Sequence, residues 1–245
     1  MLAAAVLAPG AAIGSFLNVV AGRLPQRLSL WRPRSACPAC GHEIAWYDNV
    51  PVVSFAVLRG RCRSCRAPIS WRYPAVEVTT ALLIAASFFH FGLTADAVVA
   101  AFFCSALVVL SAIDIEHRIL PDRIVLPSTL VVLLAQTVLH PSLEWVIAAF
   151  AASLFLFLAV LAYPRGMGMG DVKLALLMGA MLGRTVSAAL AVGMVAALVP
   201  ALVLLARHGS AARKMGIPFG PFLALGSVVA LFVGDALLNA YIGLL

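Results

Sequence analysis

The chain has 245 residues, of which 63% are hydrophobic and only 11% are charged, and its mean hydropathy is +1.05. Soluble domains are nearer half apolar and a quarter charged, so this composition excludes an ordinary soluble globular protein and indicates a polytopic membrane protein. The net charge of +7 could suggest a nucleic-acid partner, but in a membrane protein an excess of basic residues usually reflects topology.

Apolar segments long enough to cross a bilayer recur along the whole chain. A transmembrane helix needs about 20 mainly apolar residues, with a range of about 17–25. We predict an all-α fold with about eight such helices, of which the fourth and the sixth are short: 2–20, 75–91, 95–113, 124–139, 143–163, 172–182, 185–206 and 221–245. The first segment lacks a basic region ahead of its apolar run, so we expect a retained helix rather than a cleaved signal peptide.

The basic residues predict the orientation of these helices. If the N-terminus lies outside, the inner segments are 21–74, 114–123, 164–173 and 207–220. These segments contain all of the 17 lysines and arginines except Arg184. Because cytoplasmic loops carry the excess of Lys and Arg, we expect the four segments to face the cytoplasm and both termini to lie on the opposite side.

The first inner segment carries two cysteine pairs, Cys37-x-x-Cys40 and Cys62-x-x-Cys65, with 21 residues between them. Paired Cys-x-x-Cys sequences at roughly this separation are typical of a tetrahedral Zn²⁺ site, and a reducing cytoplasm favours thiolates over disulfides. Four protein ligands leave no open coordination position, so we expect a structural metal that stabilises a segment too small to build a large core. The alternative is a redox-active pair of dithiols.

These features predict three parts: a first transmembrane helix (1–22), a small cytoplasmic zinc-binding domain (23–74) and a seven-helix membrane domain (75–245). The zinc-binding segment is basic, which could indicate nucleic-acid binding. However, topology and the thiolate charge explain its arginines, and the single aromatic pair Trp46-Tyr47 offers little surface for base stacking. We predict no nucleic-acid partner.

Two aspartates fall at the inner ends of predicted helices. The third helix runs inward and ends at Asp114, and the sixth runs outward and starts at Asp171. We therefore expect both carboxylates at the same depth at the cytoplasmic edge of the bilayer, where ionisable groups are rare and usually functional. Two carboxylates in a partly dehydrated site share a proton, so one can activate water while the other protonates a carbonyl. This is the chemistry of an aspartic protease.

Residues near the aspartates are weaker candidates for the same site. Glycines before Asp171 allow positive φ values and the close approach of another backbone. Glu77 opens the second helix on the inner side, and we expect Asp122 to cap the fourth helix. The supporting residues that we predict are Gly168, Gly170, Lys173 and Glu77.

Structural explanations compete with these functional ones. Asp171 could cap the start of its helix, and Asp114 could be an interfacial residue paired with Arg118. Glu77 could similarly pair with Arg72. The glycine pattern at 166–170 does not predict a nucleotide-binding loop, because that fingerprint needs a preceding strand and a βαβ unit.

A series of short motifs, in matching order, resembles the bacterial prepilin leader peptidases, which are bifunctional peptidase/N-methyltransferases of type IV pilus and type II secretion systems. The resemblance runs from about Gly14 to the last predicted helix. The motifs are Gly14–Pro25, the two cysteine pairs, Asn49–Ser54, Leu58–Cys62, Ile69–Pro74 with Glu77, Ile113–Glu116, Leu120–Asp122, Gly168–Asp171 and Pro218–Phe–Gly–Pro221.

The resemblance implies an activity and the residues that carry it. The family's catalytic pair falls on Asp114 and on Asp171 of the Gly-x-Gly-Asp motif, which is shared with presenilin-like intramembrane proteases. The implied reaction removes a basic leader after a glycine at the cytoplasmic membrane face and then methylates the new N-terminal residue with S-adenosylmethionine. A glycine linked with methylation falls on Gly60, and the family's zinc ligands fall on Cys37, Cys40, Cys62 and Cys65.

The implied location is the bacterial inner membrane, with both termini periplasmic and with the zinc domain and the aspartates on the cytoplasmic side. The implied partners are the N-terminal segments of prepilins or pseudopilins, besides membrane lipids; the oligomeric state is not predicted. Because both the leader and the inner surface are basic, we expect local carboxylates to receive the leader: Glu43, Asp48, Glu77 or Glu116.

Two alternative functions stay open. One is an intramembrane peptidase without methyl transfer, whose zinc domain is only a scaffold. The short stretch between Pro25 and Cys37 departs from the family pattern and would reduce a methyltransferase pocket. The other is a non-enzymatic transporter in which the two aspartates carry protons or cations.

Overall fold

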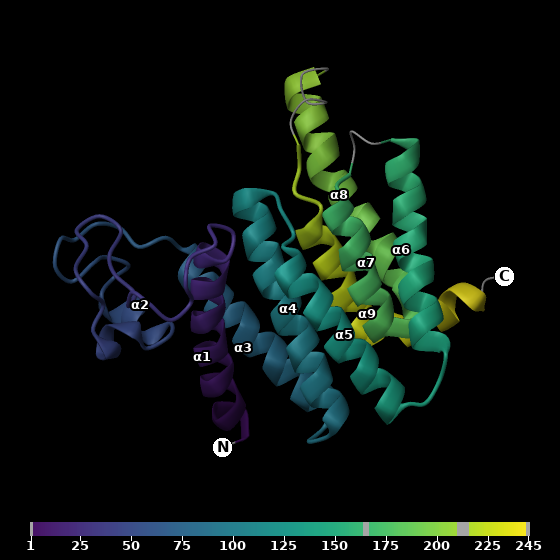
Figure 1. Cartoon of the computed structure of the whole chain (residues 1–245), viewed down its shortest axis with the longest axis horizontal. Coiled ribbons are helices and arrows are strands. Elements are labelled where there is room, and N and C mark those ends of the chain that lie inside the picture. Colours follow the sequence, from purple (N-terminus) through teal and green to yellow (C-terminus); the bar gives the residue numbers. More distant parts are fainter. Residues whose placement is uncertain (1, 164–166, 210–215, 244–245) are drawn as a thin grey trace. The chain divides into compact units, whose positions relative to one another are not determined.

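The computed structural model describes residues 2–163, 167–209 and 216–243 (Figure 1). Within these ranges the chain is helical, with two isolated β-bridges and no strand, so the predicted all-α class is confirmed for the described residues. Residues 164–166 and 210–215 of the predicted inner segments lie outside these ranges, among them Arg165, Gly166, Arg213 and Lys214.

Eight long α-helices follow one another in the described chain, and their ends lie within four residues of the predicted ends. The elements are α1 (Leu2–Arg23), η1 (Trp46–Asn49), α2 (Val53–Val57), α3 (Arg72–Phe91), α4 (Ala95–His117), α5 (Asp122–Leu139), α6 (Glu144–Ala162), α7 (Met169–Leu182), η2 (Gly183–Thr185), α8 (Val186–His208) and α9 (Gly220–Ile242).

Seven described stretches are long and apolar enough to cross a membrane, so the chain is a multi-pass membrane protein. One of them, Met169–His208, contains both α7 and α8, which the short 3-10 turn η2 separates. Helix α7 has only 14 residues. At about 1.5 Å per residue it is about 21 Å long, which is shorter than a hydrocarbon core of about 30 Å. The short sixth helix is therefore confirmed.

The chain divides into two compact units, residues 1–112 and 113–245. In the first unit, α1 packs along α3 through glycines. A Cβ atom on Gly14 would lie 2.6 Å from the Cα of Glu77, and one on Gly10 would lie 2.9 Å from the Cα of Ala81. Small residues allow membrane helices to approach this closely. The segment between α1 and α3 contains η1, α2 and all four cysteines of the two pairs.

In the second unit, α7 packs against α5, α6 and α9, and most of its side chains are buried. Gly179 permits the closest contact, because a Cβ atom there would meet the carbonyl oxygen of Ala148 and lie 2.5 Å from the Cα of Ala149. Helices α8 and α9 cross in the same way, since a Cβ atom on Gly226 would meet the carbonyl oxygen of Ala189. These crossings bring the start of α7 and the start of α9 into one compact unit.

The two ends of α7 have different surroundings. At its C-terminal end, Gly183 has a φ of +55° where the chain turns into η2, and Glu144 accepts a hydrogen bond from the Arg184 amide (2.9 Å). At its N-terminal end, α7 lies beside the end of α4, the start of α5 and the segment before α9. Pro221 lies in the first turn of α9, as predicted.

Candidate active site and metal centre

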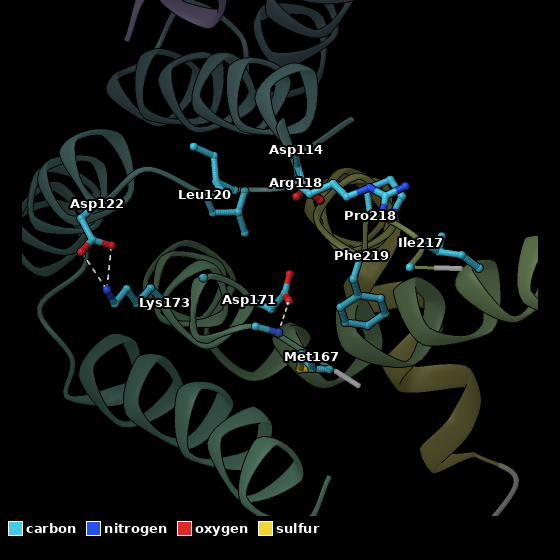
Figure 2. Close-up of a pocket in the computed structure, with 14 residues that line it drawn as sticks. Asp114, Arg118, Leu120, Asp122, Met167, Asp171, Lys173, Ile217, Pro218 and Phe219 are labelled. Atoms are coloured by element: carbon cyan, nitrogen blue, oxygen red, sulfur yellow. Dashed lines mark hydrogen bonds and ion pairs between the residues drawn. The ribbon is translucent and has the colours of Figure 1, made fainter. Parts of the chain in front are cut away.

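A pocket of about 340 Å³ in the second unit brings the two predicted aspartates together. Asp114 lies in the last turn of α4, and Asp171 lies in the first turn of α7. Figure 2 shows both side chains among residues from α4, α5, α7 and the segment before α9. The lining residues are Asp114, Arg118, Ile119, Leu120, Asp122, Met167, Gly168, Gly170, Asp171, Lys173 and 216–219.

Asp171 is buried, with 8% of its surface exposed, and its carboxylate accepts a hydrogen bond from the amide of Gly168 (3.2 Å). Gly168, not Asp171, is the N-cap of α7, and Asp171 lies three positions further on. The capping alternative is therefore correct in part, because the carboxylate does satisfy a backbone amide at the start of the helix. The same residue nevertheless lines the pocket.

Neither Gly168 nor Gly170 has a positive φ, which corrects our expectation for these two residues, and Gly170 acts through close approach. Gly168 has a φ of −90°, and Gly170 lies within α7. A Cβ atom on Gly170 would lie 3.0 Å from the Cβ of Leu120, in the segment that precedes α5. The missing side chain at 170 thus allows this segment to pack against α7 beside the pocket.

Asp114 is also buried, with 6% of its surface exposed, and its Oδ2 accepts a hydrogen bond from the amide of Gly220 (2.9 Å). The predicted partner, Arg118, donates its backbone amide to the Asp114 carbonyl (2.9 Å), and its guanidinium charge acts on the carboxylate. Helix α4 continues to His117, so Asp114 is a helical residue and does not follow the helix.

The prediction that Asp122 caps α5 is wrong. Pro121 is the N-cap, and Asp122 is the first helical residue. Its carboxylate accepts two hydrogen bonds from the Lys173 ammonium group, at 2.7 Å and 2.8 Å. Asp122 is thus a pocket residue that sequence reasoning missed, because no local pattern links two side chains 51 positions apart.

The pocket has the elements of a two-carboxylate site. Asp114 and Asp171 lie near enough for the charge of one to act on the other. Two such carboxylates can hold one proton between them and activate a water molecule bound in the pocket. Arg118 and Lys173 supply positive charge to the same pocket.

The four cysteines of the first unit form one cluster, in which all sulfur atoms lie within 4.8 Å of one another. The Sγ atoms of Cys37 and Cys65 are 3.8 Å apart, and all four thiols are free of disulfides. A tetrahedral zinc site with Zn–S bonds of about 2.3 Å has sulfur–sulfur edges of about 3.8 Å. The donor set and its spacing therefore fit a metal ion of the zinc type, and one cluster fits a metal better than two separate dithiols.

The two cysteine pairs have the same backbone conformation, 25 residues apart, which we did not anticipate. Each forms a small loop closed by equivalent backbone hydrogen bonds and by one β-bridge. The bonds are Cys37 N to His42 O, Gly41 N to Cys37 O and Ile44 N to Ser35 O in the first loop, and Cys62 N to Ala67 O, Arg66 N to Cys62 O and Ile69 N to Gly60 O in the second. The sequence contains one signal of this repeat: Trp46 and Trp71 follow the two cysteine pairs at equivalent positions, also 25 residues apart.

Backbone amides favour the thiolate at the first cysteine of each loop. Those of Cys40 and Ala39 lower the pKa of Cys37 to about 7, and those of Cys65 and Ser64 lower the pKa of Cys62. Such amides help to offset the negative charge that four thiolates would place around a metal ion.

Other predicted residues already have structural partners. Glu77 is buried and accepts a hydrogen bond from the Val52 amide (2.7 Å), so it holds the segment before α2. Asp48 forms a bidentate pair with Arg63, at 2.6 Å and 2.7 Å. These two carboxylates therefore have roles in the fold of the first unit, whereas their role in receiving a leader stays a prediction.

Gly60 lies beside the second cysteine loop, with a φ of +66° that disfavours other residues. A Cβ atom there would also lie 3.0 Å from the ring of Phe55, which packs against Trp71 at a centroid distance of 4.7 Å. The local fold therefore requires glycine at this position. Its link with methylation stays a prediction.

Comparison with known proteins places the chain among leader peptidases. A family model described as "Bacterial Peptidase A24 N-terminal domain" matches residues 9–91, and one described as "Type IV leader peptidase family" matches residues 101–245. The chain is 36% identical to a prepilin leader peptidase/N-methyltransferase of Pseudomonas aeruginosa, over 95% of this chain and 91% of that protein.

Two further relatives carry the same name. The one from Burkholderia pseudomallei is 39% identical over 92% of this chain and 83% of its own length. The one from Bacillus subtilis is 36% identical over 95% of both chains. No solved structure matches the chain significantly.

Proposed function

Since this chain belongs to the type IV leader peptidase family, we propose that it cleaves the leader from prepilins or pseudopilins and then methylates the new N-terminus. The observation that carries the peptidase half is the single pocket that holds Asp114 and Asp171. Both side chains are buried, and each is held by a backbone amide at the start of a helix. This arrangement supports them as the catalytic pair.

The cleavage step needs one protonated and one ionised carboxylate. The ionised one takes a proton from a water molecule, whose oxygen attacks the scissile carbonyl, while the protonated one gives its proton to the carbonyl oxygen. Gly170 supports this site by its close packing against Leu120, and Gly168 supports it through the hydrogen bond from its amide to Asp171. Lys173 supports it through its ion pair with Asp122. Glu77 holds the segment before α2 in the first unit, and its support of the aspartate site stays a prediction.

The site's position suits a substrate that is itself partly in the membrane. The pocket lies at the ends of apolar helices that are long enough to span a bilayer. A leader outside the bilayer and an apolar segment inside it would place the scissile bond, after a glycine, at this boundary. The basic inner segments support a cytoplasmic site in the bacterial inner membrane, with both chain termini periplasmic.

The cysteine cluster fits a structural zinc ion held by Cys37, Cys40, Cys62 and Cys65. The ion would stabilise the domain at 23–74 and would take no part in cleavage by the helical domain at 75–245. Residues 1–22 would form the first membrane helix, which packs along α3. Methyl transfer from S-adenosylmethionine is supported by the names of the relatives, and we assign Gly60 to it.

Asparagine substitutions test the peptidase function. Asp114→Asn and Asp171→Asn should each abolish cleavage of a pilin-like peptide by the protein purified and reconstituted in lipid bilayers. Asp235→Asn is the matched control, because Asp235 is an exposed carboxylate paired with Arg184 (3.1 Å) at the other end of the second unit. Cleavage that persists in both pocket variants would overturn the catalytic role of the two aspartates, and absence of cleavage by the wild-type protein would favour a transporter.

A variant of the cysteine cluster distinguishes a bifunctional peptidase/methyltransferase from a peptidase whose zinc domain is only a scaffold. In Cys40→Ser we expect zinc content and methylation to fall while cleavage continues, measured by elemental analysis and by mass spectrometry of the product. Unchanged zinc content would contradict the metal assignment. Loss of both activities would show that the metal holds the whole fold, and normal methylation after zinc loss would contradict a methylation role for the domain.

A further inference from the structure

The segment Pro218–Phe–Gly–Pro221 leads into α9 and places one residue directly against the candidate site. The amide of Gly220 donates to Oδ2 of Asp114 at 2.9 Å, although the two residues are 106 positions apart. A Cβ atom on Gly220 would lie 2.8 Å from the same oxygen. Only glycine gives this amide such close access to the carboxylate.

This contact favours a negative charge on Asp114. Gly220 is the first residue of α9, and the free amides at the start of a helix carry partial positive charge. A hydrogen bond from an amide stabilises the ionised form of a carboxyl group. Arg118 follows one turn after Asp114, and its positive charge acts in the same direction.

The contacts of Asp171 favour a negative charge less strongly than those of Asp114. Its amide donor, Gly168, lies at 3.2 Å, and the lysine of the same helix turn binds Asp122. The start of α7 also favours a negative charge on Asp171, but a charge on Asp114 opposes a second one nearby. The charged groups that line the pocket are Asp114, Arg118, Asp122, Asp171 and Lys173.

We propose that the Gly220 amide is a positioning group that holds Asp114 ionised, so that Asp114 is the general base and Asp171 the general acid. This rests on the proposed peptidase function. Asp114 takes a proton from water while the water oxygen bonds to the carbonyl carbon, and Asp171 protonates the carbonyl oxygen. When the C–N bond breaks, Asp114 returns its proton to the leaving nitrogen, and one hydroxyl proton of the intermediate returns to Asp171.

The test is Gly220→Ala, measured as the pH dependence of cleavage. The added methyl group pushes the carboxylate away from the amide, so kcat/KM at neutral pH should fall about tenfold or more. The acidic limb of the pH profile should move up by about one pH unit, because Asp114 then loses its charge more readily. The alkaline limb, which reports the proton on Asp171, should stay in place.

Gly234→Ala is the matched control. It lies in the same helix, and its Cβ atom would lie 2.9 Å from the Cβ of Thr185, far along α9 from the pocket. We expect its pH limbs to stay at the wild-type positions, even if its stability falls. If Gly220→Ala lowers cleavage with both limbs unmoved, the contact is only packing, and a shift of the alkaline limb alone would reverse the two roles; either result overturns the proposal.

A second variant covers the case in which Gly220→Ala does not fold. Arg118 is exposed, so Arg118→Gln should fold, move the acidic limb upward in the same direction, and be rescued by Arg118→Lys. An unmoved limb in Arg118→Gln would contradict the charge assignment. Failure of the proposed function would appear differently, as no cleavage by the wild-type protein or as cleavage that survives Asp114→Asn and Asp171→Asn.

Discussion

Lys173 binds Asp122 across two helices, with its Nζ 2.7 Å from one carboxylate oxygen and 2.8 Å from the other. The pair joins the first turn of α7 to the first turn of α5, beside the pocket that holds Asp171 (Figure 2). Lys173 is thereby turned toward Asp122, although it follows Asp171 by only two positions.

Breaking this ion pair should reduce cleavage modestly. The Asp122 side chain is 54% exposed, so the pair contributes at most about 1 kcal/mol to stability. We expect Lys173→Ala and Asp122→Ala each to lower the cleavage rate several-fold by loosening the start of α7, and the double variant to be no worse than either. If folded Lys173→Ala is as inactive as Asp171→Asn, Lys173 takes part in the chemistry itself.

Gly170→Ala should disturb the contact between α7 and the segment before α5. Its Cβ would lie 3.0 Å from the Cβ of Leu120, and overpacking of this kind costs about 1–3 kcal/mol. Cleavage and thermal stability should both fall. Leu120→Gly in the same chain removes the obstructing Cβ and should restore part of the cleavage, whereas purely additive losses in the double variant would contradict this explanation.

Asp48→Asn should destabilise the cysteine-bearing domain in a pH-dependent way. The hydrogen bonds and charge of Arg63 hold the pKa of Asp48 below its ordinary value. The pair therefore contributes fully above the unfolded pKa of about 3.9, and its contribution is lost as pH falls through the lower folded pKa. The unfolding midpoint of the variant should lie below that of the wild type at pH 7, and the difference should shrink in strong acid.

Tryptophan fluorescence can follow this transition, because three of the four tryptophans lie between residues 31 and 71. Glu43→Gln serves as the control for the loss of one negative charge in the same domain, because Glu43 is exposed. Protonation of the cysteines affects all variants equally, so the informative quantity is the difference in midpoint. A difference that stays constant down to pH 2 would contradict the role of the pair.

Gly179→Val should separate α6 from α7. The larger side chain would meet the backbone of Ala148 and Ala149, which cannot move without displacing the helix. We expect a much lower yield of folded protein and a lower unfolding temperature. Gly22→Val is the matched control, because a Cβ atom on this helical glycine meets no atom within 4 Å. Equal loss in both variants would point to the β-branched side chain and not to the crossing.

The helices and the cysteine cluster could be predicted well from the sequence because both depend on local information. Apolar length defines a membrane helix, and a Cys-x-x-Cys loop folds through bonds within about ten residues. The expected depth of the two aspartates came from the predicted topology and stays a prediction. Their meeting in one pocket could only be expected, because it depends on how α4 and α7 pack.

The partners of the site residues could not be predicted in the same way. The hydrogen bond from Gly220 to Asp114 spans 106 positions, and the pair of Lys173 with Asp122 spans 51. Neither carries a local pattern, because each is created by the crossing of helices. Glu77, for example, accepts a hydrogen bond from the amide of Val52, 25 positions away.

Helix α7 is about 9 Å shorter than a typical hydrocarbon core of about 30 Å. A bilayer accommodates such a mismatch by local thinning, or by letting water follow polar groups inward. Both responses place hydrated space next to the first turn of α7, where Asp171 lies. Under the proposed function, the shortness of α7 would bring water to the scissile peptide bond while the apolar segment that follows this bond stays in lipid.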